Sequence, residues 1–425
     1  MFQEIIRIFK DKDLRNKILF VLFVLVVYRL AANIPIPGVD TSRVAEFFNS
    51  DQLFGLLNMF SGGGLKNISI VMLGVGPYIT ASIIMQLLMM IFPRLEQMYK
   101  EEGEAGQQKF NMITRYLTVP LAAIQTLGMI ALLRSNHVLG HLTIYNYIVI
   151  VIIATAGTIF LMWLGELITE KGIGNGVSIL IFAGIVIALP TTIKQIIATW
   201  DPTYALTYLG FLILTIITVA AIVVINEATR NIPITFARRI RGAQTGAPGS
   251  VESQLPLKVN QAGVIPIIFA MSIMLFPGMI SNLLAKSHNP LVAEIAGKVA
   301  DLFANQWFYG IVYFILVVAF TFFYTAVTFD PKTVAENLQR QGGFIANIRP
   351  GEPTVEYLNY LINRITLSGA IFLGFIAVLP FIVQAFTGNN NLTIGGTGIL
   401  IVVAVVIEMI KQIEAQLVMR DYDRL

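Results

Sequence analysis

The chain contains no cysteine among its 425 residues, and only 13% of its residues are charged. The absence of cysteine excludes a disulfide framework and thiol chemistry. Soluble domains carry about twice this charged fraction, whereas 56% apolar residues is typical of a polytopic membrane protein. No cleavable signal peptide is expected, because the charged segment 1–17 is followed by a full-length apolar run.

Enzymatic motifs are also missing. The sequence has neither an H-E-x-x-H motif nor a P-loop, which argues against a metalloprotease and against nucleotide hydrolysis by the chain itself. Its three histidines, His137, His141 and His288, fall in expected outer loops, so no metal site is predicted. We therefore expect no cofactor, no metal and no enzymatic activity.

The most informative stretch is 59–90. After a break at Ser61–Gly64, the chain runs uncharged from Ile68 to Met90, and about 20 such residues cross a bilayer. The apolar piece before the break, Phe54–Phe60, is too short to cross. A short apolar segment beside a span, joined by glycines, indicates a re-entrant half-helix lining a cavity, because unpaired amides are costly in lipid. A kinked span behind an outer loop is the alternative.

Ten apolar stretches predict an all-α polytopic fold. The expected spans are 18–34, 68–92, 115–133, 145–166, 177–198, 205–225, 262–285, 308–328, 365–386 and 394–411. Arg29 lies in the first of these, near its outer end. With the N-terminus inside, most lysines and arginines fall in inner segments, which places both termini in the cytoplasm. The cytoplasmic loops 226–262 and 329–364 are long and basic, so they suit either a partner or anionic lipid headgroups.

Ten spans divide into two halves of five, 1–200 and 201–425. Because five is odd, the halves enter the membrane from opposite sides, which is the geometry of an inverted repeat with a functional site between the halves. An ion-coupled transporter of small solutes shares that geometry but usually needs carboxylates inside the membrane. Glu166, Glu227 and Glu408 lie toward predicted cytoplasmic ends, which weakens that alternative. A membrane enzyme acting on lipid-linked substrates is disfavoured by the missing catalytic clusters.

Aliphatic and polar side chains recur at helical spacing in two spans. Val75, Ile79 and Ile83 share one helix face, as do Val177 and Ile181. Taken alone, these stripes indicate core packing or lipid contact. Polar residues such as Thr80 can join helices through hydrogen bonds worth about 0.6 kcal/mol each.

Longer motifs carry a family resemblance. They are NIPIPGVD (33–40), LNMFSGGG (57–64), LGVGPYITASIIMQLL (73–88), MWLGELITEKGIGNGVSILIFAGI (162–185), LPLKVNQAGVIPIIFA (255–270), FYTAVTFDP (323–331), IRPGEPT (348–354) and GGTGILIVV (395–403). Taken together, the chain resembles the bacterial SecY family, the channel subunit of the general protein-secretion translocase. Val75 and Gly76 depart from it, since they stand where the family usually has Ile and Met.

The resemblance implies a passive protein-conducting channel in the cytoplasmic membrane, with two pseudo-symmetric inverted five-helix halves around a central pore. The implied pore ring is Val75, Ile79, Val177, Ile181, Ile268 and Ile401. A plug covers about 54–66, including Leu57, Asn58, Met59, Phe60, Ser61, Gly62, Gly63 and Gly64. A lateral gate between the second and seventh spans includes Thr80, Ile83, Gln86, Asn175 and Phe276.

The resemblance also implies partners. Arg238, Arg239, Arg241 and Arg349 in the two cytoplasmic loops are expected to dock a SecA motor ATPase or the ribosome, since basic residues suit an acidic surface and an RNA backbone. SecE-like and SecG-like small membrane subunits are expected to associate with the chain. Signal sequences, nascent chains and membrane lipids complete the expected contacts.

Overall fold

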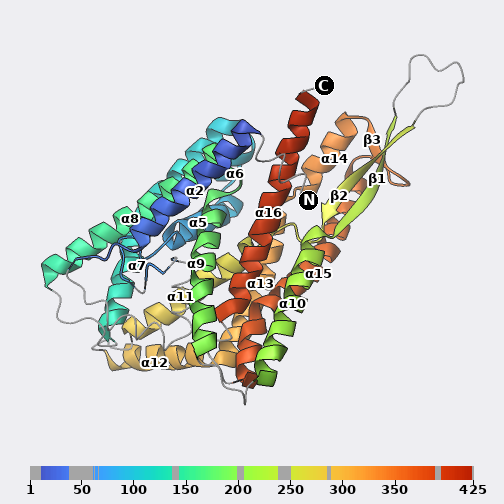
Figure 1. The fold of residues 1–425 in the computed structure, drawn as a ribbon. Coiled ribbons are helices and arrows are strands. Elements are labelled where there is room, and N and C mark those ends of the chain that lie inside the picture. Colours follow the sequence, from blue (N-terminus) through green and yellow to red (C-terminus); the bar gives the residue numbers. More distant parts are fainter. Residues whose placement is uncertain are drawn as a thin grey trace, which may run out of the picture.

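A computed structural model describes residues 11–37, 61, 63–65, 67–135, 143–198, 205–237, 250–284, 289–387 and 394–423. Long helices dominate these residues, and a small sheet extends from one end of the bundle (Figure 1). Each of the ten predicted spans falls on a helix. These helices are α2 (Lys12–Ala32), α5 (Gly76–Ile91), α7 (Gly103–Ser135), α8 (Ile144–Lys171), α9 (Gly176–Ala198), α10 (Ala205–Glu227), α11 (Ile265–Leu284), α13 (Gln306–Thr328), α15 (Glu352–Thr387) and α16 (Ile394–Asp423).

Among the described residues, five helices are long and apolar enough to cross a membrane, or six if α5 and α6 (Pro93–Lys100) form one bent span. The break between α5 and α6 bends the chain by 108°. Two shorter apolar helical stretches are Gly176–Pro190 and Ile265–Met274. Bulky apolar side chains such as Phe23 and Ile216 point outward from the bundle, as lipid-facing positions do.

The second predicted span starts later than the sequence indicated. Residues 68–75 form turns, and α5 begins only at Gly76, with Pro77 in its first turn. The reason is a pairing with the end of the first span: the Ile36 amide donates to the Ile68 carbonyl at 2.9 Å, and the Ile70 amide donates to Ile34 at 3.0 Å. These hydrogen bonds satisfy the backbone without a helix. The predicted span 68–92 is therefore helical only from Gly76.

The turn between α8 and α9 is tightly built around Gly176. A Cβ at this position would lie 1.8 Å from the Gly165 carbonyl oxygen, so only glycine fits. The Gly176 amide donates to the Thr169 hydroxyl at 2.9 Å, and that hydroxyl donates to the Gly165 carbonyl at 3.0 Å. Asn175 accepts from the Ser178 amide at 3.2 Å and so caps the start of α9.

A three-stranded antiparallel sheet was not anticipated. β1 (Thr229–Ala237) pairs with β2 (Ser250–Lys258) on one side and with β3 (Gly343–Ile345) on the other, placing Ile234 opposite both Ser253 and Ile345. Ile232, Leu257 and Ile345 pack with Leu358 and other residues of α15. The two long loops 226–262 and 329–364 therefore share one hydrophobic core, which we call the loop domain.

Two of the three carboxylates considered in the sequence form ion pairs between helices. Arg115 of α7 contacts Glu166 of α8 at 2.6 Å, and Lys411 of α16 contacts Glu227 of α10 at 2.8 Å. Exposed pairs of this kind contribute little to stability, typically about 0–1 kcal/mol. They link α7 with α8 and α10 with α16, which is a structural role.

Candidate functional site

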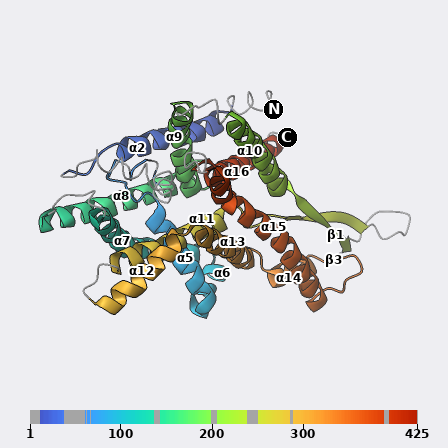
Figure 2. The ribbon, with the colours of Figure 1, turned by 90° about the horizontal axis from the view of Figure 1, so that it is seen from below.

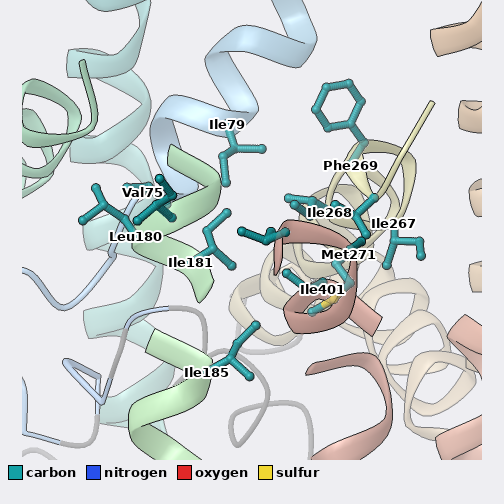
Figure 3. Close-up of a cluster of buried hydrophobic side chains, with 14 of the residues drawn as sticks. Val75, Ile79, Leu180, Ile181, Ile185, Ile267, Ile268, Phe269, Met271 and Ile401 are labelled. Carbon is teal, nitrogen blue, oxygen red and sulfur yellow. The ribbon is translucent and has the colours of Figure 1, made fainter. Parts of the chain in front are cut away.

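The predicted pore-ring residues come together in the main hydrophobic core. Val75 and Ile79 come from the start of α5, Ile181 from α9, Ile268 from α11 and Ile401 from α16. Their exposed fractions lie between 0% for Ile401 and 8% for Ile79. Figure 3 shows the ring side chains converging from these helices. Val177 is half-buried and packs against the same core. We call these six residues the aliphatic ring.

The chemistry of the aliphatic ring is set by what its side chains cannot do. Alkyl groups offer no hydrogen bond that would replace the hydration shell of an ion, so a passage closed by them excludes ions by dewetting. Opening a water-filled passage there would expose apolar side chains to water, at a free-energy cost of about 25 cal/mol for each Å² exposed. The described contacts among the ring members are apolar packing, which has no directional bonds to break when side chains separate.

Sequence reasoning missed several neighbours of the aliphatic ring. Leu180, Ile185 and Met271 belong to the same buried core and lie beside the ring in Figure 3. Ile185 follows Ile181 by four residues, so the helical stripe starting at Val177 was a usable signal. Leu180, three residues after Val177, could have been found in the same way, whereas Met271 comes from α11 and required the three-dimensional arrangement.

The helices expected to form the lateral gate, α5 and α11, are in contact. Ile83 of α5 is buried in the main core. Phe276 belongs to α11, one residue before Pro277, which interrupts the helix's hydrogen bonding. Apolar packing therefore supplies the described contact between these two helices.

The polar residues of the predicted gate form hydrogen bonds within their own helices and to α7. Thr80 donates to the Gly76 carbonyl at 3.0 Å and accepts from Gln125 of α7 at 3.3 Å. Gln86 donates to Ser82 at 3.4 Å, and its amide oxygen is buried without a hydrogen-bond partner in the described part of the chain. Asn175 makes the local cap at α9 described above. Gln125 was missed because its approach to Thr80 is non-local.

Only the end of the predicted plug is described. The Ser61 hydroxyl accepts from the Leu65 amide at 3.1 Å, and a Cβ on Gly64 would lie 2.8 Å from the Ser69 hydroxyl. Leu65 is buried with Ile130 of α7 and Ile150 of α8. The described end is thus anchored on α7 and α8. Leu57, Asn58, Met59, Phe60 and Gly62 lie outside the described residues.

Arg349 lies on the surface of the loop domain, between β3 and α15. Its carbonyl accepts from the buried Thr354 hydroxyl at 2.9 Å, and Asn347 and Gly351 on either side have positive φ angles of 64° and 99°. The guanidinium is exposed and forms no ion pair with any described residue. The fixed turn therefore presents an available positive charge. Arg238, Arg239 and Arg241 lie outside the described residues.

Comparison with known proteins settles the family. A family model described as SecY matches residues 69–410. The chain belongs to the SecY family. It is 45% identical to the protein translocase subunit SecY of Streptomyces coelicolor, over 98% of each chain. The predicted family is thereby confirmed.

Solved structures show the same fold. The chain is similar to a structure described as a protein conducting channel, with 21% identity, a TM-score of 0.59, and coverage of 93% of this chain and 91% of the other. It is also similar to Sec61 in the canine ribosome-channel complex from the endoplasmic reticulum, with 20% identity, a TM-score of 0.56 and the same coverage. The all-α polytopic class is confirmed for this SecY family member, which is a multi-pass membrane protein.

Proposed function

We propose that this chain is the channel subunit of a protein translocase, through which unfolded polypeptides cross the membrane. The aliphatic ring is the observation that supports this function most directly. Its members come from α5 and α9 in residues 1–200 and from α11 and α16 in residues 201–425, so the ring joins two chain segments that can separate. Membership of a family of translocase subunits also makes the chain a transport protein and not an enzyme.

The two proposed halves, 1–200 and 201–425, open at the contact between α5 and α11. Hydrophobic signal sequences and transmembrane segments leave sideways there, because that contact is made of apolar side chains, which lipid or an apolar segment can replace. The unpaired amide oxygen of Gln86 offers a hydrogen-bond acceptor to an arriving segment. The plug, residues 54–66, seals the resting channel from the outer side.

The loop domain is the proposed docking site for the energy source. Its exposed Arg349, with Arg238, Arg239 and Arg241, suits either the acidic surface of a SecA motor ATPase or the phosphates of ribosomal RNA. The Sec61 relative is described in a complex with a ribosome. SecE-like and SecG-like subunits complete the proposed assembly. Helix α10 offers a surface for such a small membrane subunit, because only 11% of its apolar stretch is buried within this chain.

The proposed location is the cytoplasmic membrane, with both termini and the loop domain in the cytoplasm. The distribution of lysine and arginine supports this orientation. The loop domain also lies at the opposite end of the bundle from α12 (Pro290–Ala304), the helix of a predicted outer loop (Figure 1).

Disulfide trapping tests the channel, because the chain has no native cysteine. Single variants Ile79→Cys, Ile181→Cys, Ile268→Cys and Ile401→Cys are combined with a stalled polypeptide carrying one cysteine. Adducts are expected at all of these positions. The matched control is Ile315→Cys on the exposed face of α13, which should give none. Active transport without ring adducts, or equal adducts at Ile315, would overturn the proposal.

The same experiment separates the channel from an ion-coupled transporter of small solutes, which would yield no polypeptide adduct. Two of the candidate carboxylates, Glu166 and Glu227, are already paired with basic residues at helix ends. No observation favours the transporter.

A further inference from the structure

Helix α12 (Pro290–Ala304) differs from the spans in direction and composition. It lies across one end of the bundle in Figure 1, and the view from that end in Figure 2 shows it along the edge of the molecule. Its 15 residues, about 22 Å at 1.5 Å per residue, are too few to cross a bilayer. The helix therefore has a role other than spanning the membrane.

The sides of α12 fall into three sectors. One sector packs against the protein. Ala296 is buried, and Phe303 packs on the main core, with 5.6 Å between the centroids of its ring and the ring of Phe308 in α13. A second sector is charged and exposed, with Glu294 and Lys298 paired at 2.7 Å and Asp301 one turn further on.

The third sector is apolar and exposed. Leu291, Ile295 and Leu302 have exposed fractions of 69%, 64% and 49%. They recur at i, i+4 and i+11, which brings them to one side of a helix with 3.6 residues per turn. A helix in water would gain nothing from such a stripe, whereas a helix lying in a membrane surface needs an apolar side and a polar side next to each other.

Trp307, three residues after the end of α12, marks the depth of the membrane. Trp307 lies in the first turn of α13 with 63% of its surface exposed, and exposed tryptophans at the ends of spans gather at the membrane-water interface. Asn305 connects α12 rigidly to α13. Its backbone amide donates to carbonyls in the last turn of α12, and its side-chain oxygen caps α13 by accepting from the Trp307 amide at 3.0 Å. The start of α13 therefore holds α12 at the level of Trp307.

We infer that α12 is an in-plane anchor that inserts Leu291, Ile295 and Leu302 into the acyl region of the outer leaflet. Glu294, Lys298 and Asp301 face water, and the lipid-facing surface of α13 continues the apolar stripe through Ile311. Because α12 also packs against α11, the anchor joins the membrane surface to one of the two proposed gate helices. The occupant of the exposed stripe is lipid.

Spin-label accessibility tests this inference on the full chain. Single cysteines replace Ile295 and its neighbour Glu294, an adjacent pair placed in different sectors. Each labelled protein is reconstituted in vesicles of phosphatidylethanolamine and phosphatidylglycerol, and relaxation by oxygen is compared with relaxation by a water-soluble nickel chelate. The oxygen-to-nickel ratio should be several-fold higher at Ile295→Cys than at Glu294→Cys. The lipid-facing Ile315→Cys and the solvent-exposed Lys332→Cys calibrate the two extremes.

Two results would overturn the anchor. A ratio at Ile295→Cys equal to that at Lys332→Cys would place the stripe in water. Exclusion of both oxygen and nickel at Ile295→Cys would mean that a protein surface covers the stripe. Leu291→Cys gives a second measurement of the oxygen-to-nickel ratio in the apolar sector. A folding defect of the Ile295→Cys variant alone therefore does not decide the outcome.

Discussion

The aliphatic ring lies in the main hydrophobic core together with Tyr309 and Phe381 of the contact between α13 and α15, which continues outward to the exposed Phe375, but the two regions are built differently. The ring consists of isoleucine and valine side chains from α5, α9, α11 and α16. The contact between α13 and α15 is aromatic, with Tyr309 and Phe381 at 5.3 Å between ring centroids and Phe314 and Phe375 at 5.5 Å. We call this second contact the aromatic frame.

The difference indicates which part of the core opens. Aromatic pairs add about 0.5–1.5 kcal/mol each beyond the area they bury, and they prefer particular ring angles, such as the edge-on contact of Phe314 with Phe375. Aliphatic side chains lack that angular preference, so the ring can separate and close again at lower cost. Both frame helices also belong to residues 201–425, whereas the ring joins helices from both proposed halves. We expect the frame to stay intact while the ring opens.

The strongest test of this comparison is Gly374→Ala in the aromatic frame. A Cβ at Gly374 would lie 2.7 Å from the ring of Phe314, so the two helices must separate or the ring must leave its position. Overpacking of this kind typically costs about 1–3 kcal/mol. We expect a lower thermal unfolding temperature for the purified protein and less protein recovered in the membrane.

Gly210→Ala in α10 is the matched control, because a Cβ there meets no atom within 4 Å. That variant should be as stable as the parent chain or slightly more stable, since alanine favours helix. Equal unfolding temperatures for the two variants would mean that the frame is no more rigid than its surroundings.

The second test places a polar group in the aliphatic ring. Ile401 is fully buried, and Ile401→Asn introduces an amide that attracts water into the closed passage. We expect several-fold higher ion conductance of the resting channel in planar bilayers, and transport of substrates with defective signal sequences. The unfolding temperature is measured alongside, because a buried amide without a partner also destabilises the fold.

Ile401→Leu is the control for volume, since it retains the apolar character and should leave conductance low. If Ile401→Asn conducts no more than Ile401→Leu, residue 401 does not seal the passage.

The sequence predicted the positions of the helices well because lipid leaves a long apolar run few alternatives to helix. It failed where distant segments meet. The start of α5 depends on the pairing of Ile36 with Ile68, and β3 pairs with β1 from more than a hundred residues away. The alternation of Ile232, Ile234 and Phe236 was a local signal for strand β1, but the sequence alone did not indicate which strands pair with it.

The candidate site divides in the same way. The i, i+4 spacing placed Val75 with Ile79 and Val177 with Ile181, whereas their meeting with Ile268 and Ile401 was implied by the family resemblance alone. The partners of the polar residues divide likewise. Asn175 caps its own helix, which is a local contact that short polar side chains favour, whereas Thr80 accepts from Gln125 of α7, which lies 45 residues away in the sequence.

The smallest structural effect is expected at the surface, where Arg349→Glu reverses one exposed charge of the loop domain. The turn around Arg349 is held by its backbone carbonyl and Thr354, so the substitution should leave the unfolding temperature unchanged. Transport driven by the motor or the ribosome should fall several-fold, because a positive contact becomes repulsive.

Arg340→Glu is the control. It reverses another exposed charge in the same region, at the end of α14 (Pro331–Arg340), where the parent residue already contacts Glu336 at 3.7 Å. If both variants transport equally well, the docking surface is not centred on Arg349. If Arg349→Glu also lowers the unfolding temperature, its transport defect reflects the fold of the loop domain and not a lost contact with a partner.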